Sequence, residues 1–430
     1  MSTYPMQTRR RFLSAAASAL ALPTFIPARA LGRDGAVAPS DRLGLAVIGL
    51  GDRGNYHLNA LCAFKEVQVL AMCDVRGDAL QRVCGKFREK VGTSDCQATQ
   101  DFREILARPE VDAITVAAPE NWHAVMSIEA MKAGKDVYCE KALALSVAEG
   151  RAVCDAVQRT GRVLQAGTQQ RSDPRFRFAC ELARNGYLGK LRSVYAAVPS
   201  GRRILSIPPA PQPADVNYDL WLGPAPYKPY RENLCNYNWY FLTDYCAGWI
   251  QSWGVHHLDI ALWGAPELEA STIEVEGVAD FLAEGDADVS FGWKVAATTP
   301  QGLRLDFYDD ASGPLGHGVR FIGDQGWVHV TRGGMQAEPA SLLDVRLKPR
   351  EERLYVSDNH MENFLQCMRS RREPVAPARV CHAATTLSLV ADIASRAGRK
   401  LVWDWGRERF TNDEQANRLL SRTLRQPWHV

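Results

Sequence analysis

Short apolar runs alternate with stretches of helical periodicity between residues 42 and 165. The runs predict buried strands and the stretches between them predict helices. The predicted strands are Leu43–Ile48, Val67–Cys73, Ala113–Ala117, Asp136–Tyr138 and Val163–Gln165, and the predicted helices are Arg53–Ala63, Gly77–Val91, Phe102–Leu106, Ala124–Ala133 and Ser146–Thr160. Apolar strands linked by helices are typical of a parallel sheet covered on both faces. We therefore expect a doubly wound Rossmann domain over residues 42–165.

Beyond residue 166 the pattern changes, because strand-like runs follow one another with few helices between them. After a helix and a proline-rich crossing segment, the predicted strands are Leu191–Pro199, Thr272–Val278, Val289–Thr298, Leu303–Asp309, Gly318–Ile322, Gly326–Thr331 and Leu342–Leu347, and the later predicted helices are Asn359–Arg369 and Arg379–Ala397. Such runs favour an α+β domain with a large, mostly antiparallel sheet. The overall fold class is α/β, with this second domain over residues 166–398 and a tail over 399–430.

The first 30 residues follow the order of an export signal. Arg9–Arg11 are charged, Phe12–Ile26 are apolar, and Ala28–Ala30 form a small-x-small cleavage site. The apolar part is too short for a stable membrane span, and no other stretch is long and apolar enough. The paired arginines predict a twin-arginine signal, which is read by machinery that exports folded proteins; the alternative is a chance arginine cluster before a disordered tail. We expect a periplasmic or otherwise exported protein with a linker over residues 31–41.

Composition narrows the class of protein further. The chain is 46% hydrophobic and 23% charged, as in ordinary globular proteins, and its formal charge of +2 gives no reason to expect a nucleic-acid partner. The 11 cysteines lack the spacing of a zinc module or a disulfide scaffold. We predict no metal site. Because the chain would fold in the reducing cytoplasm before export, we expect mostly buried free thiols.

A glycine-rich turn follows the first predicted strand and opens the first predicted helix. Gly49, Gly51 and Gly54 form the G-x-G-x-x-G pattern, in which the glycines allow a tight turn, close approach to a pyrophosphate and close helix packing. Asp74 ends the second strand, where a carboxylate can accept both ribose hydroxyls and would repel a 2′-phosphate. This predicts NAD as the cofactor. NADP stays open because Arg53 and Arg76 could bind such a phosphate; Asp52 and Arg53 complete the predicted cofactor contacts of the turn.

Two further loops follow strands at the edge where doubly wound sheets bind ligands. One carries Pro119–His123 and the other carries Cys139–Ala142. A lysine such as Lys141, placed beside a nicotinamide, could polarise or deprotonate a substrate hydroxyl if burial and neighbouring charges lower its pKa. The alternative is that Glu140 only begins a helix and that Lys141 is a solvated surface charge.

Several of these motifs together resemble the glucose–fructose oxidoreductase/inositol dehydrogenase (Gfo/Idh/MocA) family. The resemblance rests on Gly49–Gly54, Asp74, Pro119–His123, Ala130–Ser146, Gln165–Ser172, Asp219–Pro224 and Trp253–Asp259. It implies that Lys141 takes the place of the lysine that lies against nicotinamide and substrate, although Ala142 stands where the family usually has proline. With it, the predicted cofactor contacts extend to Pro119, Asn121, His123, Glu140 and Gln169. The resemblance also implies a homo-oligomer, a dimer or tetramer built through the open face of the second sheet.

Aromatic residues are concentrated between Tyr230 and Gly264, a stretch that contains His256 and His257. Aromatic faces interspersed with polar groups suit a carbohydrate ring, whereas ordinary core and subunit interface would explain at least half of these residues equally well. The predicted substrate contacts are Lys141, Trp122, Arg171, Trp239, Tyr240, His257 and Asp259.

If residues 252–263 are helical, Ser252, His256 and Asp259 share one face. A lone histidine is more often structural than catalytic, but the family's D-x-x-x-H-x-x-D pattern falls on these three positions and implies His256 as acid–base and Asp259 as substrate binder. The first position is Ser252, which cannot orient or protonate His256 by charge as a carboxylate would. A metal at His256, His257 and Asp259 is the weaker alternative, because no further cluster of ligands accompanies them.

Three functions agree with these features. The first is an exported NAD(P)-dependent oxidoreductase that acts on a sugar, cyclitol or glycoside and recycles a tightly bound cofactor, with Lys141 and His256 managing the hydroxyl proton. The second is an NAD-dependent glycosidase or deglycosidase that oxidises transiently and cleaves by elimination. The third is a non-catalytic sugar-binding protein with a vestigial nucleotide site.

Overall fold

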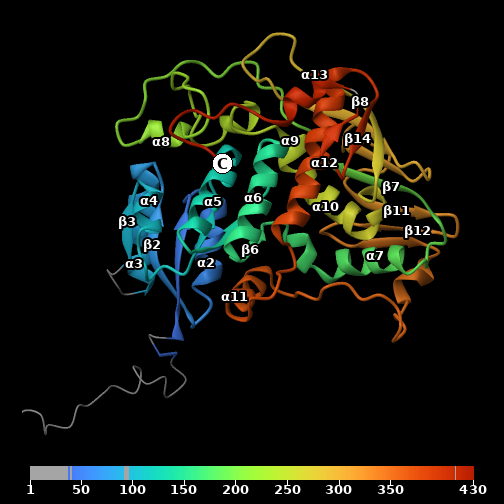
Figure 1. The fold of residues 1–430 in the computed structure, drawn as a ribbon, viewed down its shortest axis with the longest axis horizontal. Coiled ribbons are helices and arrows are strands. Elements are labelled where there is room, and N and C mark those ends of the chain that lie inside the picture. The colour runs from blue at the N-terminus through green and yellow to red at the C-terminus, as the bar shows by residue number, and fades with distance from the viewer. Residues whose placement is uncertain (1–36, 39–40, 92–95, 412) are drawn as a thin grey trace, which may run out of the picture.

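The computed structural model describes residues 37–38, 41–91, 96–411 and 413–430, and Figure 1 shows two sheets that each carry helices. The predicted export signal and most of the predicted linker lie outside the described residues. Within the described residues, no helix is long and apolar enough to cross a membrane.

Six parallel strands form the first sheet, in the order β3-β2-β1-β4-β5-β6. The strands are β1 (Leu43–Ile48), β2 (Val67–Cys73), β3 (Gln97–Thr99), β4 (Ala113–Val116), β5 (Asp136–Cys139) and β6 (Leu164–Ala166), linked by the helices α2 (Asp52–Leu61), α3 (Gly77–Val91), α4 (Phe102–Leu106), α5 (His123–Lys132) and α6 (Val147–Thr160). The predicted doubly wound fold is confirmed. The strand order reverses between β1 and β4, and the loops after these two strands therefore leave a crevice for a ligand at the carboxyl edge.

Local sequence signals set the limits of these helices. The Ser146 side chain accepts a hydrogen bond from the Glu149 N–H at the start of α6, and Gly161 ends that helix with φ +61°. The Asp101 side chain caps α4 in the same way by accepting from Arg103 N–H. The loops before these helices are therefore held at defined positions beside the crevice.

Nine strands form the second sheet, in the order β13-β12-β11-β7-β10-β9-β8-β14-β15. They are β7 (Leu191–Val198), β8 (Thr272–Asp280), β9 (Gly292–Thr298), β10 (Arg304–Asp309), β11 (Gly318–Gly323), β12 (Trp327–Val330), β13 (Met335–Glu338), β14 (Leu401–Asp404) and β15 (Arg409–Phe410). Among the described strands of this sheet, β7 and β10 are the one parallel pair. The mostly antiparallel sheet that the sequence predicts is thus confirmed.

Helices cover one face of the second sheet and leave the other face open. The covering helices are α7 (Pro174–Arg184), α10 (Gly254–Gly264) and α12 (Ala378–Ala397). On the opposite face β8 exposes Val278, with 64% of its surface accessible. The helix α11 (His360–Ser370) packs instead against the first sheet, where Phe364 joins a core cluster with Leu45.

The second half also differs in places from the sequence prediction. The strand predicted at Leu342–Leu347 is wrong: residues Ala340–Asp344 form a 3₁₀ turn, η7, directly after Pro339. Within this turn Leu342 is the one buried residue, so the segment lacks the alternating burial of a strand. Conversely, the predicted tail contributes β14 and β15 to the sheet edge, and the short strands β3 and β13 were not predicted from the apolar pattern.

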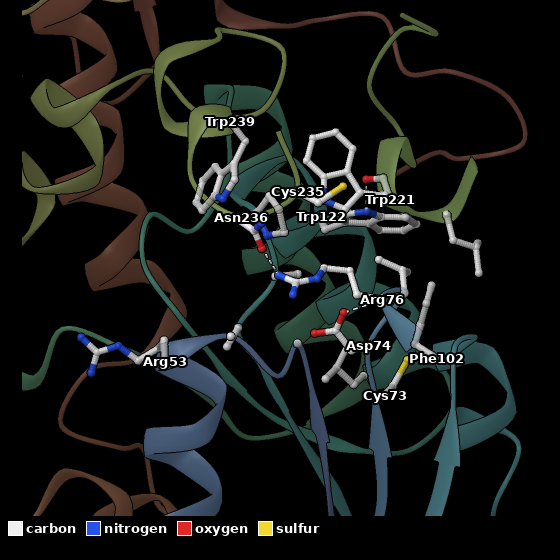
Figure 2. A pocket seen from close by; sticks show the side chains of 18 of the residues that line it. Arg53, Cys73, Asp74, Arg76, Phe102, Trp122, Trp221, Cys235, Asn236 and Trp239 are labelled. Atoms are coloured by element: carbon white, nitrogen blue, oxygen red, sulfur yellow. Dashed lines mark hydrogen bonds between the residues drawn. The ribbon is translucent and has the colours of Figure 1, made fainter. Parts of the chain in front are cut away.

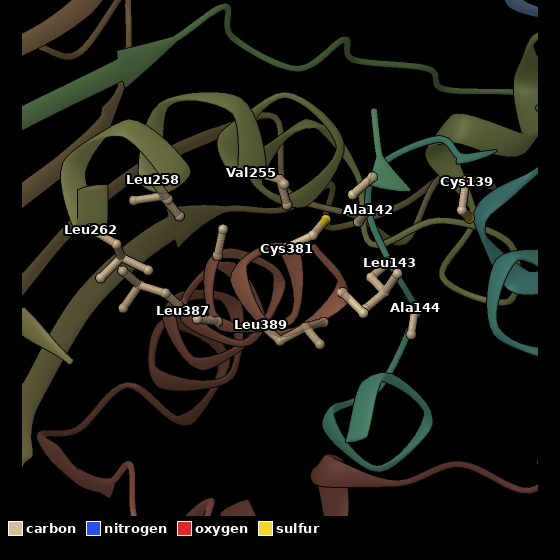
Figure 3. Close-up of a cluster of buried hydrophobic side chains, with 14 of the residues drawn as sticks. Cys139, Ala142, Leu143, Ala144, Val255, Leu258, Leu262, Cys381, Leu387 and Leu389 are labelled. Atoms are coloured by element: carbon tan, nitrogen blue, oxygen red, sulfur yellow. The ribbon is translucent and has the colours of Figure 1, made fainter. Parts of the chain in front are cut away.

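The long helix α12 joins the two halves of the molecule. Figure 3 shows its Cys381, Leu387 and Leu389 between the loop after β5, represented by Leu143, and α10, represented by Leu258. The Leu143 N–H also donates to Thr385 Oγ1 on α12 over 3.1 Å. One rigid helix therefore supports both the loop that carries Lys141 and the helix that carries His256.

All eleven cysteines lie within the described residues and are free. Nine are buried, while Cys62 and Cys235 are partly accessible. The expectation of mostly buried free thiols is confirmed.

Candidate active site

The glycine turn lies between β1 and α2 and leaves room for a phosphate. Gly49 has φ +84°, and a Cβ there would meet Ala117 O at 2.4 Å; a Cβ on Gly54 would lie 1.7 Å from Gly49 O. Gly51 faces open space, with nothing within 4 Å of the position of a Cβ. The turn therefore combines two glycines that the packing requires with one whose backbone is open to a ligand, as a dinucleotide cradle needs.

Asp74 stands at the end of β2 beside this turn. Its Oδ2 accepts the Leu50 N–H over 2.7 Å and its Oδ1 accepts the Arg76 N–H over 2.9 Å. Burial raises the pKa of the Asp74 carboxyl, and these two hydrogen bonds oppose that rise. Each oxygen keeps a second lone pair for a ribose hydroxyl. The Arg76 guanidinium is already bound to Asp78 and Asn236, so the site fits the unphosphorylated ribose of NAD.

A cavity of about 510 Å³ extends from this turn across the carboxyl edge of the sheet. Figure 2 shows the rings of Trp122, Trp221 and Trp239 across the cavity from Asp74. Flat apolar rings facing a carboxylate suit the adenosine half of a dinucleotide, since a base can pack on them while the ribose is held by hydrogen bonds.

The roof of the cavity is the segment 215–245, which includes α8 (Tyr218–Leu222) and crosses from the second domain. Several hydrogen bonds fasten the roof to the first domain. The Gly77 N–H donates to Asp215 O over 2.8 Å, the Asn217 N–H donates to Val75 O over 2.9 Å, and the Asp78 N–H donates to Asp215 Oδ2 over 2.9 Å. A ligand in the cavity would therefore lie under a segment that is hydrogen-bonded to the first domain.

The C-terminal residues cross back over the first domain and hold the roof from outside. Arg422 forms an ion pair with the buried Glu149 over 2.8 Å, and the Arg425 side chain donates to Gly223 O over 2.9 Å. The ring of Trp428 packs edge-on against Trp122, with 4.7 Å between the ring centroids. Because Trp122 lines the cavity, the chain end supports the cofactor site directly.

A second cavity of about 300 Å³ adjoins the first and shares Arg53, Ala118 and Tyr240 with it. Lys141 and His256 both line it. The Lys141 Nζ donates to Ser252 Oγ over 3.0 Å, and the Lys141–Ala142 peptide is cis. The lysine and histidine thus face one space, next to the place where a nicotinamide would emerge from the first cavity.

His256 is a buried imidazole in the wall of the second cavity. Burial, together with the positive charges of Lys141 and Arg332, lowers the pKa of its imidazole well below the usual range. Its Nδ1 is buried and has no hydrogen-bond partner among the described residues. At neutral pH the ring is therefore neutral, as a general base requires.

Glu140 lies beneath the second cavity as a buried anion. His57 Nε2 lies 2.9 Å and Gln169 Nε2 lies 3.0 Å from its Oε1, and Arg53 Nε lies 3.5 Å away. Burial alone would raise the pKa of Glu140, but the hydrogen bond and charge of His57, with the charges of Arg53 and Lys141, lower it to about 2.

Family models match both halves of the chain. The model of the NAD-binding Rossmann fold of the Gfo/Idh/MocA oxidoreductases matches residues 43–168, and the model of their C-terminal alpha/beta domain matches residues 198–430. The chain belongs to the Gfo/Idh/MocA oxidoreductase family. The predicted resemblance and the NAD-binding domain are confirmed.

Individual relatives match this Gfo/Idh/MocA protein over part of their length. Myo-inositol 2-dehydrogenase of Thermotoga maritima is 33% identical over 171 residues, which are 40% of this chain and 47% of that protein. A glycosyl hydrolase family 109 protein of a Shewanella species is 32% identical over 130 residues, which are 29% of this chain and 28% of that protein. The chain therefore spans less than half the length of each of these two relatives.

A solved structure extends the likeness of fold over most of the chain. The WlbA dehydrogenase of Bordetella pertussis, in complex with NADH and UDP-GlcNAcA, has a TM-score of 0.61 at 17% identity and covers 84% of this chain and 98% of that one. At this identity the likeness concerns the architecture alone.

The structure of this family member separates the predicted site residues into two groups. Most line the two cavities: Gly49, Gly51, Asp52, Arg53, Asp74, Pro119, Trp122, His123, Glu140, Lys141, Trp239, Tyr240 and His256. Trp122 lines the cofactor cavity rather than the substrate cavity for which it was predicted. His123 contacts the carbonyl oxygens of Ala118 and Ala142, so it also holds the loops together.

The remaining predicted residues lie behind the lining of these cavities. Arg171 and Asp259 form a buried ion pair over 2.8 Å, with the guanidinium stacked on Trp263. His257 Nδ1 lies 2.8 Å from Ala197 O, and Asn121 donates to Leu222 O over 3.1 Å. Gly54 packs against Gly49, and Gln169 reaches the site only through Glu140. None of these remaining residues is among those that line the two cavities.

Sequence reasoning missed two charged residues of the second cavity. Glu120 stands inside the predicted Pro119–His123 motif, so its position was available from the sequence. Arg332 lies in the turn between β12 and β13, packed on Trp253. Only the tertiary fold brings that distant hairpin to the site. Among the described residues, no group of His, Cys, Asp or Glu side chains has the arrangement of a metal site.

Proposed function

We propose that this Gfo/Idh/MocA protein is an exported oxidoreductase that oxidises a CH–OH group of a sugar, cyclitol or glycoside and keeps its NAD bound between turnovers. The observation that carries the proposal is that Lys141 and His256 face one small cavity beside a covered NAD cavity. NAD, when bound, supplies the acceptor for a hydride. The chain must then bind the substrate, orient its hydroxyl and remove the hydroxyl proton.

Lys141 and His256 have different roles at the substrate hydroxyl. Neutral His256 accepts the proton, and the Lys141 ammonium stabilises the negative charge that develops on the oxygen. Ser252 accepts the hydrogen bond from Lys141 and so fixes the direction of the ammonium. Because Ser252 carries no charge, it leaves His256 in its neutral form, which a carboxylate at that position would oppose.

Retention of the cofactor is supported by the roof and the chain end. The roof segment is hydrogen-bonded to Val75, Gly77 and Asp78, and these bonds would hold it over a bound dinucleotide. An exported enzyme has no cytoplasmic pool of nicotinamide to draw on, so a second sugar would return the cofactor to its starting state in place. The proposal keeps the sequence-based prediction of a twin-arginine signal over residues 1–30 and hence of the export machinery as a partner.

The experiment that tests this function uses protein purified with its bound cofactor. Myo-inositol, D-glucose and methyl glucosides are added singly, and reduction of the nicotinamide is followed by its near-ultraviolet absorbance. We expect reduction with one of these substrates in the wild type and none in Lys141→Ala. NAD-loaded protein whose cofactor is reduced by none of these substrates would contradict the proposed oxidation. Protein that neither carries nor binds a nicotinamide would favour a sugar-binding role with a vestigial nucleotide site.

A second candidate function is cleavage of a glycosidic bond through transient oxidation and elimination. The likeness to a glycosyl hydrolase family 109 protein favours it. In such a cycle the cofactor is not consumed, which also suits export. Release of p-nitrophenol from a p-nitrophenyl glycoside without added NAD, with no net oxidised sugar among the products, would support this reaction over dehydrogenation.

Localisation and assembly are tested separately. Substituting Arg9 and Arg10 with lysine should keep the protein in the cytoplasm if the twin-arginine signal directs export. The open face of the second sheet, where Val278 is exposed, is the surface we propose for a dimer or tetramer. Light scattering of wild-type and Val278→Lys protein would show whether that face holds the assembly together.

A further inference from the structure

Glu120 is a buried acid in the wall of the substrate cavity. It follows β4 and Pro119 and begins the 3₁₀ turn η3 (Glu120–Trp122). Only 2% of its surface is accessible. Both of its carboxylate oxygens are buried, and the one partner that the described residues offer them is the thiol of Cys246.

The other buried acids of the described chain show that this situation is exceptional. Each has a nitrogen partner, which is stronger than a thiol, for its carboxylate: His57 for Glu140, Arg422 for Glu149, Arg371 for Asp136, Arg171 for Asp259, Arg396 for Asp392, and backbone N–H groups for Glu181 and Asp309. Burial of a carboxylate without such a partner is strongly unfavourable. A buried carboxylate that has no strong donor from the protein is expected where a bound ligand supplies the donors.

The surroundings of Glu120 point to a ligand in the second cavity. Glu120 lines that cavity together with Lys141, Ser252 and His256. On its other side Glu120 is hydrogen-bonded to Cys246: burial, and then the charge of Glu120 and this hydrogen bond, raise the pKa of the Cys246 thiol well above its usual range. The thiol offers at most a weak donor, so the strong donors for this carboxylate must come from the cavity.

We propose that Glu120 contacts the substrate and accepts hydrogen bonds from two neighbouring hydroxyl groups of a neutral polyol. The assignment rests on the proposed function, since it places the polyol beside Lys141 and His256. A carboxylate only accepts hydrogen bonds, and its two oxygens match a pair of adjacent hydroxyls. Glu120 thereby supplies the substrate-facing acid that the family pattern would place at position 252, where this chain has serine.

The test compares the NAD-loaded wild type with Glu120→Gln, which keeps the shape of the side chain and removes its charge. Affinity for myo-inositol and D-glucose is measured by ligand-dependent thermal shift and, where turnover is seen, by KM and kcat. We expect Glu120→Gln to weaken polyol binding about 10- to 100-fold, the range for loss of hydrogen bonds to a charged group. The ligand-free variant should melt no lower than the wild type, because the substitution keeps the size of the side chain and breaks no ion pair within the described residues.

Hydroxyl-deleted ligands identify the contact. A deoxyglucose that lacks one of the two hydroxyls should bind the wild type more weakly than D-glucose, and the difference should disappear in Glu120→Gln. The exposed Glu89 supplies the control variant Glu89→Gln, which should match the wild type throughout. NAD content is measured in every sample, so loss of cofactor, which would contradict the proposed function, is distinguished from loss of polyol binding.

Three results would overturn the assignment. They are equal polyol affinity in Glu120→Gln and wild type, a lowered melting temperature in the ligand-free variant, which would show that Glu120 only stabilises the fold, and tighter binding of glucuronate than of glucose by the wild type. The last result would show that Arg332 and Arg53 select an anionic substrate and that Glu120 does not face it.

Discussion

Lys141 and Ser252 meet across the two domains, where the ammonium of the lysine donates a hydrogen bond to the serine hydroxyl over 3.0 Å. The lysine follows the end of β5 in the first domain, and the serine ends the short helix α9 (Trp249–Ser252) in the second. The loop after β5 is hydrogen-bonded to α12 through Leu143, and α9 packs on the same helix. The bond therefore fixes the direction of the proposed catalytic cation relative to His256 without adding a negative charge to the cavity.

Removal of the Lys141 amine should strongly lower the rate of substrate oxidation and leave NAD binding unchanged. We expect Lys141→Ala to lower kcat about 10²- to 10⁴-fold, the usual contribution of a proton-transfer or charge-stabilising side chain. NAD content should stay unchanged because the glycine turn and the roof are untouched. Lys132→Ala, an exposed lysine on α5, is the control. Equal loss of NAD and activity would show that Lys141 only supports the nucleotide site.

A carboxylate at position 252 should change the pH dependence. In the wild type the lowered pKa of His256 keeps the base form present well below neutral pH, so kcat/KM should stay flat on the acid side. Ser252→Asp adds a negative charge near the ring and should raise its pKa. The acid limb of the kcat/KM profile should then move to higher pH. Ser252→Ala, which adds no charge, should leave that limb in place.

Cofactor choice should depend on Asp74. Asp74→Ala removes the acceptor for the ribose hydroxyls, and we expect NAD affinity to fall about 10- to 100-fold. The preference for NAD over NADP should shrink because the repulsion of a 2′-phosphate is lost. Titration of both nucleotides into cofactor-stripped protein measures this. Asp358→Ala, at an exposed position, should behave as wild type, and unchanged NAD affinity in Asp74→Ala would contradict the ribose contact.

Acid should destabilise the protein partly through Glu140. Its folded-state pKa of about 2 lies below its ordinary value of 4.5. The ionised form therefore contributes stability that is complete above 4.5 and is lost as the pH falls toward 2, on the order of 3 kcal/mol. Chemical denaturation between pH 6 and pH 3 should show a steeper loss in the wild type than in Glu140→Gln. Parallel curves would show that Glu140 is not held ionised in the folded state.

The chain end should govern cofactor release. Trp428→Ala removes the ring that packs on Trp122, and Trp122 lines the NAD cavity. We expect bound NAD to be lost faster on dialysis, with a modest fall in melting temperature. Tyr227→Ala is the matched control, because Tyr227 belongs to the roof but is 71% exposed. Identical dialysis rates in Trp428→Ala and wild type would mean that the chain end does not retain the cofactor.

The sequence patterns of strands, turns and helices were enough to predict the glycine turn and the acidic residue of the cofactor site. Gly49, Gly51 and Asp74 follow from a strand, a turn and a helix in sequence, and the structure places them around one cavity. The resemblance to the family pointed to Lys141 and His256, and the fold brings both to a second cavity.

Features that depend on tertiary packing could not be predicted from the sequence. Arg332 enters the site from a hairpin far along the chain, and the burial that singles out Glu120 is visible only in the folded molecule. The apolar run that predicted a strand at Leu342–Leu347 begins instead with the 3₁₀ turn η7. The residues of β14 form a strand by pairing with β8 at the edge of the sheet, and those of β15 pair with β14 in turn.

We propose that the protein carries its NAD with it when it is exported. The most direct test of this claim is the nicotinamide content of protein purified from the exported fraction without added nucleotide, measured after denaturation. We predict NAD or NADH in amounts stoichiometric with the chain. Exported protein that releases no nicotinamide on denaturation would contradict the claim.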